Sequence, residues 1–502
     1  MKKLAVFTVI SSALLLLPAY GYAQKASKKG EEAPKTEVQL MLEKADSSDT
    51  PLVITLEQAL QIALSENVSV KVADKEIKRT EYAKKGTYAS LFPKIDLSGN
   101  YQRTIKKQVM YMDIDMGALG GGAGDGSAPG EGGKPETGGG ESAAPAGPSM
   151  ADGLEVGRWN TWSAGVTATL PIINAQLWKS VKLSGLDIEL AVEKARSSRL
   201  SMVTEVKKAY YGTLLAREAF KVYKDVYENA VSNCEETQKK YDAQKVSEFD
   251  LVRAKTTVAN AIPQVYNAES NMILSLWQLK ALLGVDLDLN IDIDGELADY
   301  SNHMFYDVHQ HDSISLENNS TMKQLAIQAE QLAQNIKLQR FANTPTLSAA
   351  FNFSFNAMTN DFKFSQYRWT PYSYVGISLQ IPIFNGGKRC NDIRQAKNRY
   401  EQIQLQTLDT ERQLKIAIRQ NLTTMETNMK SYYAAENAVV SAQKAYDIAE
   451  KSYQVGRSTL IELNDAQLAL TQAKLSQSQA VYNFVVAKAQ LEQTLGYDFI
   501  EE

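Results

Sequence analysis

The sequence predicts a mainly α-helical protein with a smaller transmembrane β part, built from two tandem copies of one unit. Three observations support this fold class. Only 13 of the 502 residues are proline and long stretches contain none, as very long helices require. Short segments in which apolar and polar residues alternate interrupt the helical stretches. Several local patterns recur at a constant distance along the chain, which indicates a duplication.

The N-terminus has the layout of a cleavable signal peptide. Lys2 and Lys3 precede an apolar run that ends in small residues at Ala23. We therefore assign residues 1–23 to a signal peptide and residues 24–54 to an N-terminal periplasmic segment. No later apolar run is long enough for a membrane-spanning helix. Because no cysteine lies near the cleavage point, a lipid anchor is not expected.

The duplication sets the domain boundaries. The segment LLGVD at 282–286 recurs as TLGYD at 494–498, an offset of 212 residues, while Asn67 matches Asn319 at an offset of 252. We place the first structural repeat at residues 55–286 and the second at residues 319–498. An inter-repeat equatorial segment joins them at 287–318, and a short C-terminal tail follows at 499–502.

One insertion distinguishes the first copy from the second. The offset falls from 252 to 211 between the two predicted strands of each copy, so about 41 residues are extra in the first. These are the Gly-rich, mostly acidic residues 117–157. Because such a composition buries too little apolar surface to fold alone, we expect a flexible surface loop.

Two segments in each copy alternate with period two and predict β-strands, each with one apolar and one polar face. They lie at residues 95–102, 162–170, 347–356 and 375–381. Each has about the 9 to 11 residues that cross a bilayer. Aromatic residues gather near the strand beginnings, as an interfacial girdle would: Trp159, Trp162, Tyr367, Trp369, Tyr372 and Tyr374. A half-buried sheet in a soluble domain would show the same alternation.

The remaining residues predict unusually long helices. Residues 174–244 and 386–455 contain no internal proline, and at about 1.5 Å per residue each such helix spans about 100 Å. The helices that follow them, at 247–283 and 459–495, return only about half that distance. We expect the helices predicted at 56–91 and 319–341 to stack end on end with these return helices and to complete two rods.

Little in the sequence indicates chemistry at a metal or cofactor site. Cys234 and Cys390 lie far apart along the predicted helices, so no disulfide is expected. The three histidines, His303, His309 and His311, fall in the inter-repeat segment, where loop positions are the simpler interpretation. From residue 286 to 294, Asp or Asn alternates with Leu or Ile. The run looks like a calcium loop but has Ile where such a loop needs glycine, so it predicts a short strand. The sequence has no nucleophile and base constellation, Gly-rich phosphate loop or metal-ligand motif, so an enzyme is disfavoured and no cofactor is expected. The mild net charge of -4 gives no case for nucleic-acid binding.

The second hairpin turn, YQVGRSTLIELNDA at 453–466, and the duplicated order of strands and helices resemble the TolC family of outer-membrane efflux proteins across the mature chain. The resemblance implies a homotrimer in the outer membrane, with a 12-stranded β-barrel of four strands per chain continuous with an α-helical periplasmic barrel. It also implies a tripartite efflux or type I secretion system, in which a periplasmic adaptor (membrane fusion protein) and an inner-membrane transporter of the RND or ABC type deliver drugs or other cargo.

The resemblance also assigns roles at the periplasmic tip. Glu462 and Asp465, three residues apart on one helix face, match the acidic pore constriction of the family, although a solvated helix face would look the same. The gate network corresponds to Asp250, Tyr453 and Arg457. The residues expected to meet the adaptor are Lys245, Val246, Ser247, Gly456, Ser458 and Thr459. A periplasmic coiled-coil scaffold without a channel is the alternative, but it does not explain the four strands.

Overall fold

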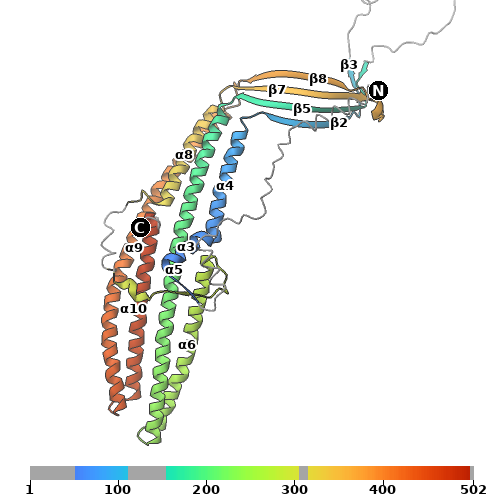
Figure 1. Ribbon diagram of the computed structural model, residues 1–502. Coiled ribbons are helices and arrows are strands. Elements are labelled where there is room, and N and C mark those ends of the chain that lie inside the picture. Colours follow the sequence, from blue (N-terminus) through green and yellow to red (C-terminus); the bar gives the residue numbers. More distant parts are fainter. Residues whose placement is uncertain (1–50, 111–153, 303, 305–314, 498–502) are drawn as a thin grey trace, which may run out of the picture. The chain divides into compact units, whose positions relative to one another are not determined.

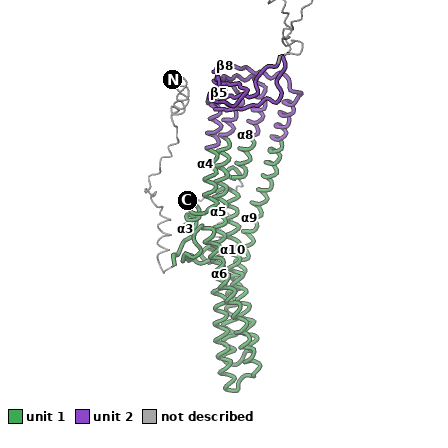
Figure 2. Tube along the Cα trace, turned by 90° about the vertical axis from the view of Figure 1, so that its right-hand side faces the viewer, with its two compact units in different colours: residues 1–81, 186–330, 400–502 green, residues 82–185, 331–399 purple. Residues whose placement is uncertain are grey.

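The computed structural model describes residues 51–110, 154–302, 304 and 315–497. These described residues form two compact units: those within 1–81, 186–330 and 400–502 make up unit 1, and those within 82–185 and 331–399 make up unit 2 (Figure 2). The predictions for the signal peptide, for residues 117–153, for His303, His309 and His311 and for the C-terminal tail fall outside the described residues. Within those residues, every helix is too short or too polar to span a bilayer.

Unit 1 is built on two helical hairpins that lie side by side (Figure 1). In the first, α5 (Ala175–Asp242) turns into α6 (Glu248–Leu283). In the second, α9 (Lys388–Gln454) turns into α10 (Leu460–Leu495). The first residues of α5 and α9 belong to unit 2. All four predicted helices are confirmed to within two residues at each end, and α6 continues through Pro263.

A short parallel strand pair packs against the hairpins of unit 1. β1 (Leu52–Ile54) pairs with β6 (Ile291–Ile293), followed by the 3-10 turn η3 (Leu297–Ser301). The buried Tyr210 of α5 donates a hydrogen bond from its hydroxyl to the carbonyl oxygen of Asp294 at 2.8 Å. The strand predicted from the Asp alternation is therefore confirmed over three residues, with Ile291 and Ile293 buried.

In the first copy, the helix predicted at 56–91 is divided into α3 (Leu56–Glu66) and α4 (Val68–Ala89). Asn67, which lies between them, has an extended backbone. Its side-chain amide donates to the carbonyl oxygen of Leu282 at 2.7 Å, and its side-chain oxygen accepts from the amide of Ser69 at 2.7 Å. One side chain thus caps the end of α6 and the beginning of α4, where the two helices meet end on.

The second copy repeats this helix joint. Asn319 precedes α8 (Ser320–Phe341), donates to the carbonyl oxygen of Thr494 at 2.6 Å, and accepts from the amide of Met322 at 2.9 Å. The predicted end-on stacking of each return helix is therefore confirmed in both copies.

Glycine ends each return helix at these joints. Gly284 and Gly496 cap α6 and α10 with φ angles of 75° and 78°, in the left-handed region. A β-carbon on Gly496 would lie 2.2 Å from the carbonyl oxygen of Asn318, whereas one on Gly284 would lie 2.9 Å from that of Glu66. The two backbones meet so closely that a side chain does not fit between them.

Unit 2 contains a four-stranded antiparallel sheet in the order β2-β5-β7-β8. Its strands are β2 (Lys94–Arg103), β5 (Asn160–Ile173), β7 (Thr346–Thr359) and β8 (Thr370–Gln380). All four predicted strands are confirmed. The short strands β3 (Gln108–Met110) and β4 (Leu154–Val156) pair with each other, so the last residues of the loop predicted at 117–157 form a strand and not a loop. The 3-10 turn η4 (Phe364–Gln366) lies between β7 and β8.

The register separates the two faces of the sheet as the alternation predicts. Across one face, Leu97 pairs with Val166 and Val166 with Phe353. Across the other, Ser98 pairs with Gly165 and Gly165 with Ser354. One face is therefore apolar, and the other presents mainly hydroxyl and amide groups.

Candidate functional site

The two hairpin turns share one backbone conformation although their sequences differ. Gln244 and Gly456 occupy equivalent positions with φ angles of 56° and 77°. In the first turn the amide of Lys245 donates to the carbonyl oxygen of Lys240 at 2.8 Å, and in the second Arg457 donates to Ser452 at the same distance. The first copy therefore closes its helix in the same way without glycine.

Gln244 carries a conformational cost that glycine would not. A side chain in the left-handed region costs about 1 kcal/mol, so Gln244→Gly should raise the free energy of unfolding by up to about 1 kcal/mol. Denaturant unfolding of the refolded protein in detergent measures this change. Gln238→Gly, inside α5, is the control and should destabilise by about 1 kcal/mol. Equal losses for both variants would show that the turn conformation imposes no cost on glutamine.

Each return helix begins with a capping box that uses a predicted site residue. In α6, Asp250 accepts from the hydroxyl of Ser247 at 2.7 Å, and the backbone amide of Asp250 donates to Ser247. In α10, Glu462 accepts from the hydroxyl of Ser458 at 2.5 Å and from the amide of Thr459 at 2.9 Å. Both acids thus serve as the third helical residue of a cap.

These bonds favour the ionised form of Glu462. The hydroxyl of Ser458, followed by the amide of Thr459, lowers the pKa of this carboxyl below its usual value. The cap contribution is therefore present at neutral pH and declines only as the pH falls through the lowered folded-state pKa. Asp465 lies one turn further along α10 and is exposed. The two predicted constriction residues thus share a helix, and the carboxylate of Glu462 is bound to the turn.

Tyr453 is buried, with 5% of its surface exposed, in a cluster that joins α6, α9 and α10. Its hydroxyl lies 2.5 Å from Oγ1 of Thr237 on α5. The ammonium of Lys240 lies 4.0 Å from the centre of the Tyr453 ring and donates to the Tyr453 carbonyl oxygen at 2.5 Å. Lys240 also pairs with Glu236 at 2.8 Å. Tyr453 therefore fastens one hairpin to the other near their turns.

Thr237 and Lys240 were not predicted from the sequence. The only visible signal was the spacing of four residues between Glu236 and Lys240, which is common on helix surfaces. Asp250, Tyr453 and Arg457, the predicted gate network, do not contact one another within the described part of this chain. Asp250 is engaged in its cap, and Arg457 is exposed and forms no ion pair with the described residues of its own subunit.

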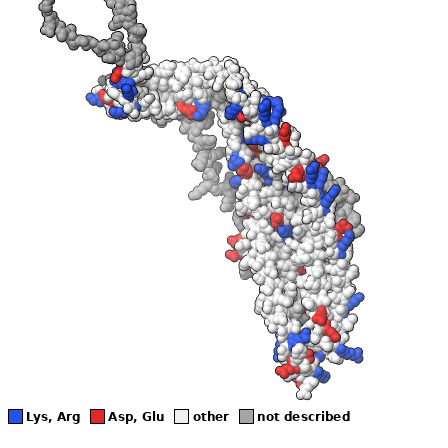
Figure 3. Space-filling view, turned by 180° about the vertical axis from the view of Figure 1, so that it is seen from behind, with Lys and Arg blue, Asp and Glu red and all other residues white. Residues whose placement is uncertain are grey.

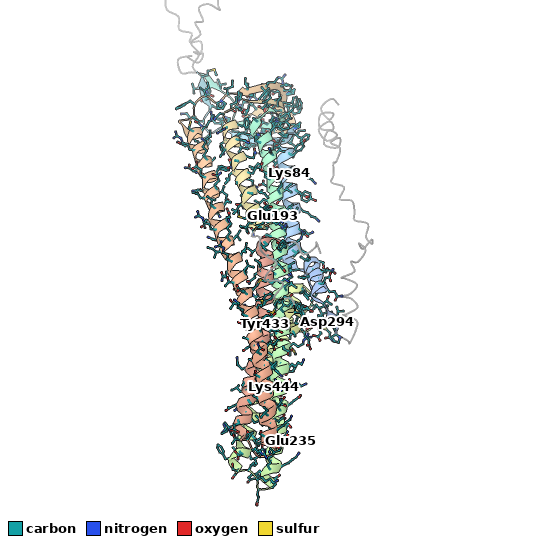
Figure 4. The ribbon with its side chains drawn as sticks, turned by 90° about the vertical axis from the view of Figure 1, so that its left-hand side faces the viewer. Lys84, Glu193, Glu235, Asp294, Tyr433 and Lys444 are labelled. Carbon is teal, nitrogen blue, oxygen red and sulfur yellow. The ribbon has the colours of Figure 1, made fainter. Side chains whose placement is uncertain are left out.

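The predicted docking residues lie where partners could reach them. Lys245, Ser247, Gly456 and Thr459 are exposed, and Val246 and Ser458 are half-buried. Apolar side chains stand beside them, with Phe249 and Val455 about 69% and 70% exposed. A groove of about 440 Å³ lies between α5 and α6, and Figure 4 shows one lining residue, Glu235, near the turn. It is lined by Val231, Cys234, Glu235, Gln238, Lys239 and Val258.

Cys234 is a free thiol in this groove, and Cys390 is also free, as predicted. Among the described ranges, no group of His, Cys, Asp or Glu has the arrangement of a metal site.

The predicted aromatic girdle divides between the two faces of the sheet. Trp162 lies on the apolar face, where its ring centre is 4.2 Å from that of Tyr101. Tyr372 and Tyr374 pair with Ser354 and Asn352, and so lie on the polar face. Trp159, Tyr367 and Trp369 lie in the segments that lead into β5 and β8. Trp162 thus lies on the apolar face of the sheet and Tyr372 and Tyr374 lie on the polar face, while the girdle itself stays a prediction.

Comparison with known proteins gives one family. The family described as "Outer membrane efflux protein" matches residues 59–285 and 313–497. The outer membrane protein TolC of Vibrio cholerae is 20% identical over 341 residues, which are 66% of this chain and 76% of the relative. The alkaline protease secretion protein AprF of Pseudomonas aeruginosa is 22% identical over 309 residues, which are 60% of this chain and 63% of AprF.

Solved structures share the fold. The CmeC outer membrane channel of Campylobacter jejuni has a TM-score of 0.65 at 19% identity and covers 88% of this chain and 85% of its own. The outer membrane protein VceC of Vibrio cholerae has a TM-score of 0.63 at 15% identity, and the match covers 88% of this chain and 96% of VceC.

Proposed function

Because the chain belongs to the outer membrane efflux protein family, we propose that three copies of it form an exit duct with a gate at the turns of its helical hairpins. The family places the protein in the outer membrane and in the periplasm, as a transport duct and not an enzyme. A periplasmic scaffold without a channel, the alternative raised by the helices alone, does not agree with this membership. The TolC-like fold is the observation that carries the proposal.

The open edges of the sheet support a trimer. β2 and β8 each have one neighbour within the described chain, so both edges have unpaired backbone groups. Membrane barrels of this kind have at least about eight strands, and one chain supplies four. Three chains would supply twelve, with β8 of one subunit beside β2 of the next.

The acids near the second turn would form the constriction of the duct. A threefold axis would bring Glu462 and Asp465 of three subunits into one ring of carboxylates, which favours cations. The cap bonds that hold Glu462 in its ionised form support this assignment. Asp250, Tyr453 and Arg457 would hold the ring closed, with Asp250 and Arg457 making their links across subunits.

The contacts of Tyr453 suggest how the closed state is held within one subunit. Its bonds to Thr237 and Lys240 join the two hairpins, and such contacts are weak enough for a docked partner to release. Exposed Phe249 and Val455 support docking of an adaptor (membrane fusion protein) at the turns. The adaptor would connect the duct to an inner-membrane transporter of the RND or ABC type, in drug efflux or type I secretion.

The gate is tested by conductance in planar lipid bilayers. Tyr453→Phe combined with Arg457→Ala should raise the open population about fivefold, because a latch of about 1 kcal/mol is lost. Single-channel recordings of the purified protein measure the change. The matched control is Tyr241→Phe, since Tyr241 is the first-copy counterpart of Tyr453 and is 36% exposed. Unchanged conductance in the double variant, or an equal rise in the control, would remove the latch.

A further inference from the structure

One end of the sheet in unit 2 carries a concentration of positive charge. At this end lie residues 101–110, 154–162 and 357–370, which contain the connections that follow β2, precede β5 and join β7 to β8. The only acids in these three segments are Glu155 and Asp361. Lys107 pairs with Glu155 at 3.7 Å. Five further cations are exposed and form no ion pair with the described residues; we call them the basic rim: Arg103, Lys106, Arg158, Lys363 and Arg368. Figure 3 shows Lys and Arg at this end, with a few acidic side chains among them.

The strands themselves are almost without charge. β5, β7 and β8 contain no Asp, Glu, Lys or Arg. In β2 the only charged residues are Lys94 and Asp96 at one end and Arg103 at the other. The positive charge therefore begins where the uncharged part of the sheet ends.

Aromatic rings mark the boundary between the apolar face and the basic rim. The ring centres of Trp162 and Phe364 lie 4.9 Å apart, and Trp162 also contacts Tyr101. The guanidinium of Arg103 lies 6.0 Å from the centre of the Phe362 ring. A band of aromatic rings followed by Lys and Arg is the order of groups that matches hydrocarbon, interface and headgroup at a membrane surface.

The chain path fixes which membrane surface this is. α4 leads into β2 at Lys94, and β5 leads into α5 after Ile173, so the helices join the strand ends opposite the basic rim. With the helices in the periplasm, as the proposed function requires, the basic rim faces the outer leaflet.

We propose that the basic rim binds the phosphate groups of outer-leaflet lipids. Like charges at one end of the sheet repel one another to the extent that they lie close together, and phosphates bound between them would reduce this repulsion. Arg and Lys donate charge-assisted hydrogen bonds to phosphate oxygens, and the aromatic rings beside them would contact the adjoining acyl chains. The bound lipid would anchor each subunit at the height in the membrane at which its aromatic band meets the headgroups.

Binding of a phosphorylated lipid to the full-length protein in detergent tests the proposal. The probes are lipid A with its two phosphates and the same lipid after enzymatic removal of both, each titrated and measured by native mass spectrometry. Arg158→Gln with Arg368→Gln should weaken binding of the phosphorylated lipid about 25-fold, since each cation near an anionic lipid contributes about fivefold. Equal binding of both lipids by the unaltered protein would overturn the proposal.

The control variant removes the same charge elsewhere on unit 2. Lys84→Gln with Lys85→Gln acts on α4, where Lys85 lies 5.1 Å from the Tyr82 ring centre in a comparable contact with an aromatic ring. This control should change lipid binding less than twofold. An equal loss in the control and the rim variant would mean that only the net charge matters, and the proposal would fail.

The Gly-rich insertion is the competing occupant, because residues 111–153 contain seven acids and one lysine. Excision of residues 117–153 separates the two cases. If the intact protein prefers the phosphorylated lipid and keeps this preference after the excision, lipid is the occupant of the basic rim. A preference that appears only after excision assigns the basic rim to the insertion and overturns the proposal. Neither outcome depends on the gate, since conductance is measured separately.

Discussion

Gly496→Ala should lower the free energy of unfolding by about 3 to 4 kcal/mol, because it combines backbone strain with a collision. The φ angle of 78° is one that alanine adopts only at a cost. Its β-carbon would also stand 2.2 Å from the carbonyl oxygen of Asn318. The opposing atom belongs to the backbone of the joint, so it cannot rotate away as a flexible side chain would. Denaturant unfolding in detergent, followed by circular dichroism, measures the loss.

Gly456→Ala is the matched control for this substitution. Gly456 has nearly the same φ angle, 77°, but no atom lies within 4 Å of the position that its β-carbon would take. Gly456→Ala should therefore lower the free energy of unfolding by about 1 kcal/mol, which is the cost of the backbone conformation alone. Equal losses at the two glycines would show that the contact with Asn318 relaxes without cost. The close approach of the two backbones would then not be a requirement of the fold.

Asn319→Ala should lower the free energy of unfolding by about 2 to 3 kcal/mol, because it removes a helix cap and leaves two half-buried backbone groups unpaired. Only 4% of Asn319 is exposed. The substitution would leave the carbonyl oxygen of Thr494 without its donor and the amide of Met322 without its acceptor. Unfolding under the same conditions measures this loss.

Two other asparagines provide the comparison. Asn67→Ala, at the equivalent joint, should cost nearly as much, since Asn67 is 7% exposed and makes the same two kinds of bond. Asn437→Ala removes an exposed bond to the carbonyl oxygen of Tyr433 within α9 and should change stability by less than about 0.5 kcal/mol. If Asn319→Ala were as mild as Asn437→Ala, the joints would be held by packing alone.

The sequence alone predicted much of the fold because the two copies repeat the same physical solutions. Asn67 and Asn319 recur because each must cap two helices at once, and Gly284 and Gly496 recur because a backbone passes beside each of them. The four strands were predictable because a sheet with one apolar face requires alternation with period two. The long helices were predictable from the scarcity of proline.

Contacts between distant helices were not predictable from spacing. The bond between Thr237 and Tyr453 joins residues 216 positions apart, and no local pattern indicates it. The division of the first helix at Asn67 was also missed, because asparagine is tolerated inside helices and its two bonds depend on the arrival of α6. The positions of Tyr372 and Tyr374 followed from strand register, which a count of aromatic residues ignores.

The pairing of β3 with β4 makes the chain tolerant of length at one place. Gln108 lies opposite Val156 and Met110 opposite Leu154, so the two ends of whatever sequence joins these strands are already held together. The entropic cost of closing such a connection grows only with the logarithm of its length, so doubling the length adds about 0.6 kcal/mol to the free energy of closure. Evolution can therefore lengthen, shorten or replace this stretch, and an engineer can graft an epitope there, with little effect on the folding energy of the sheet.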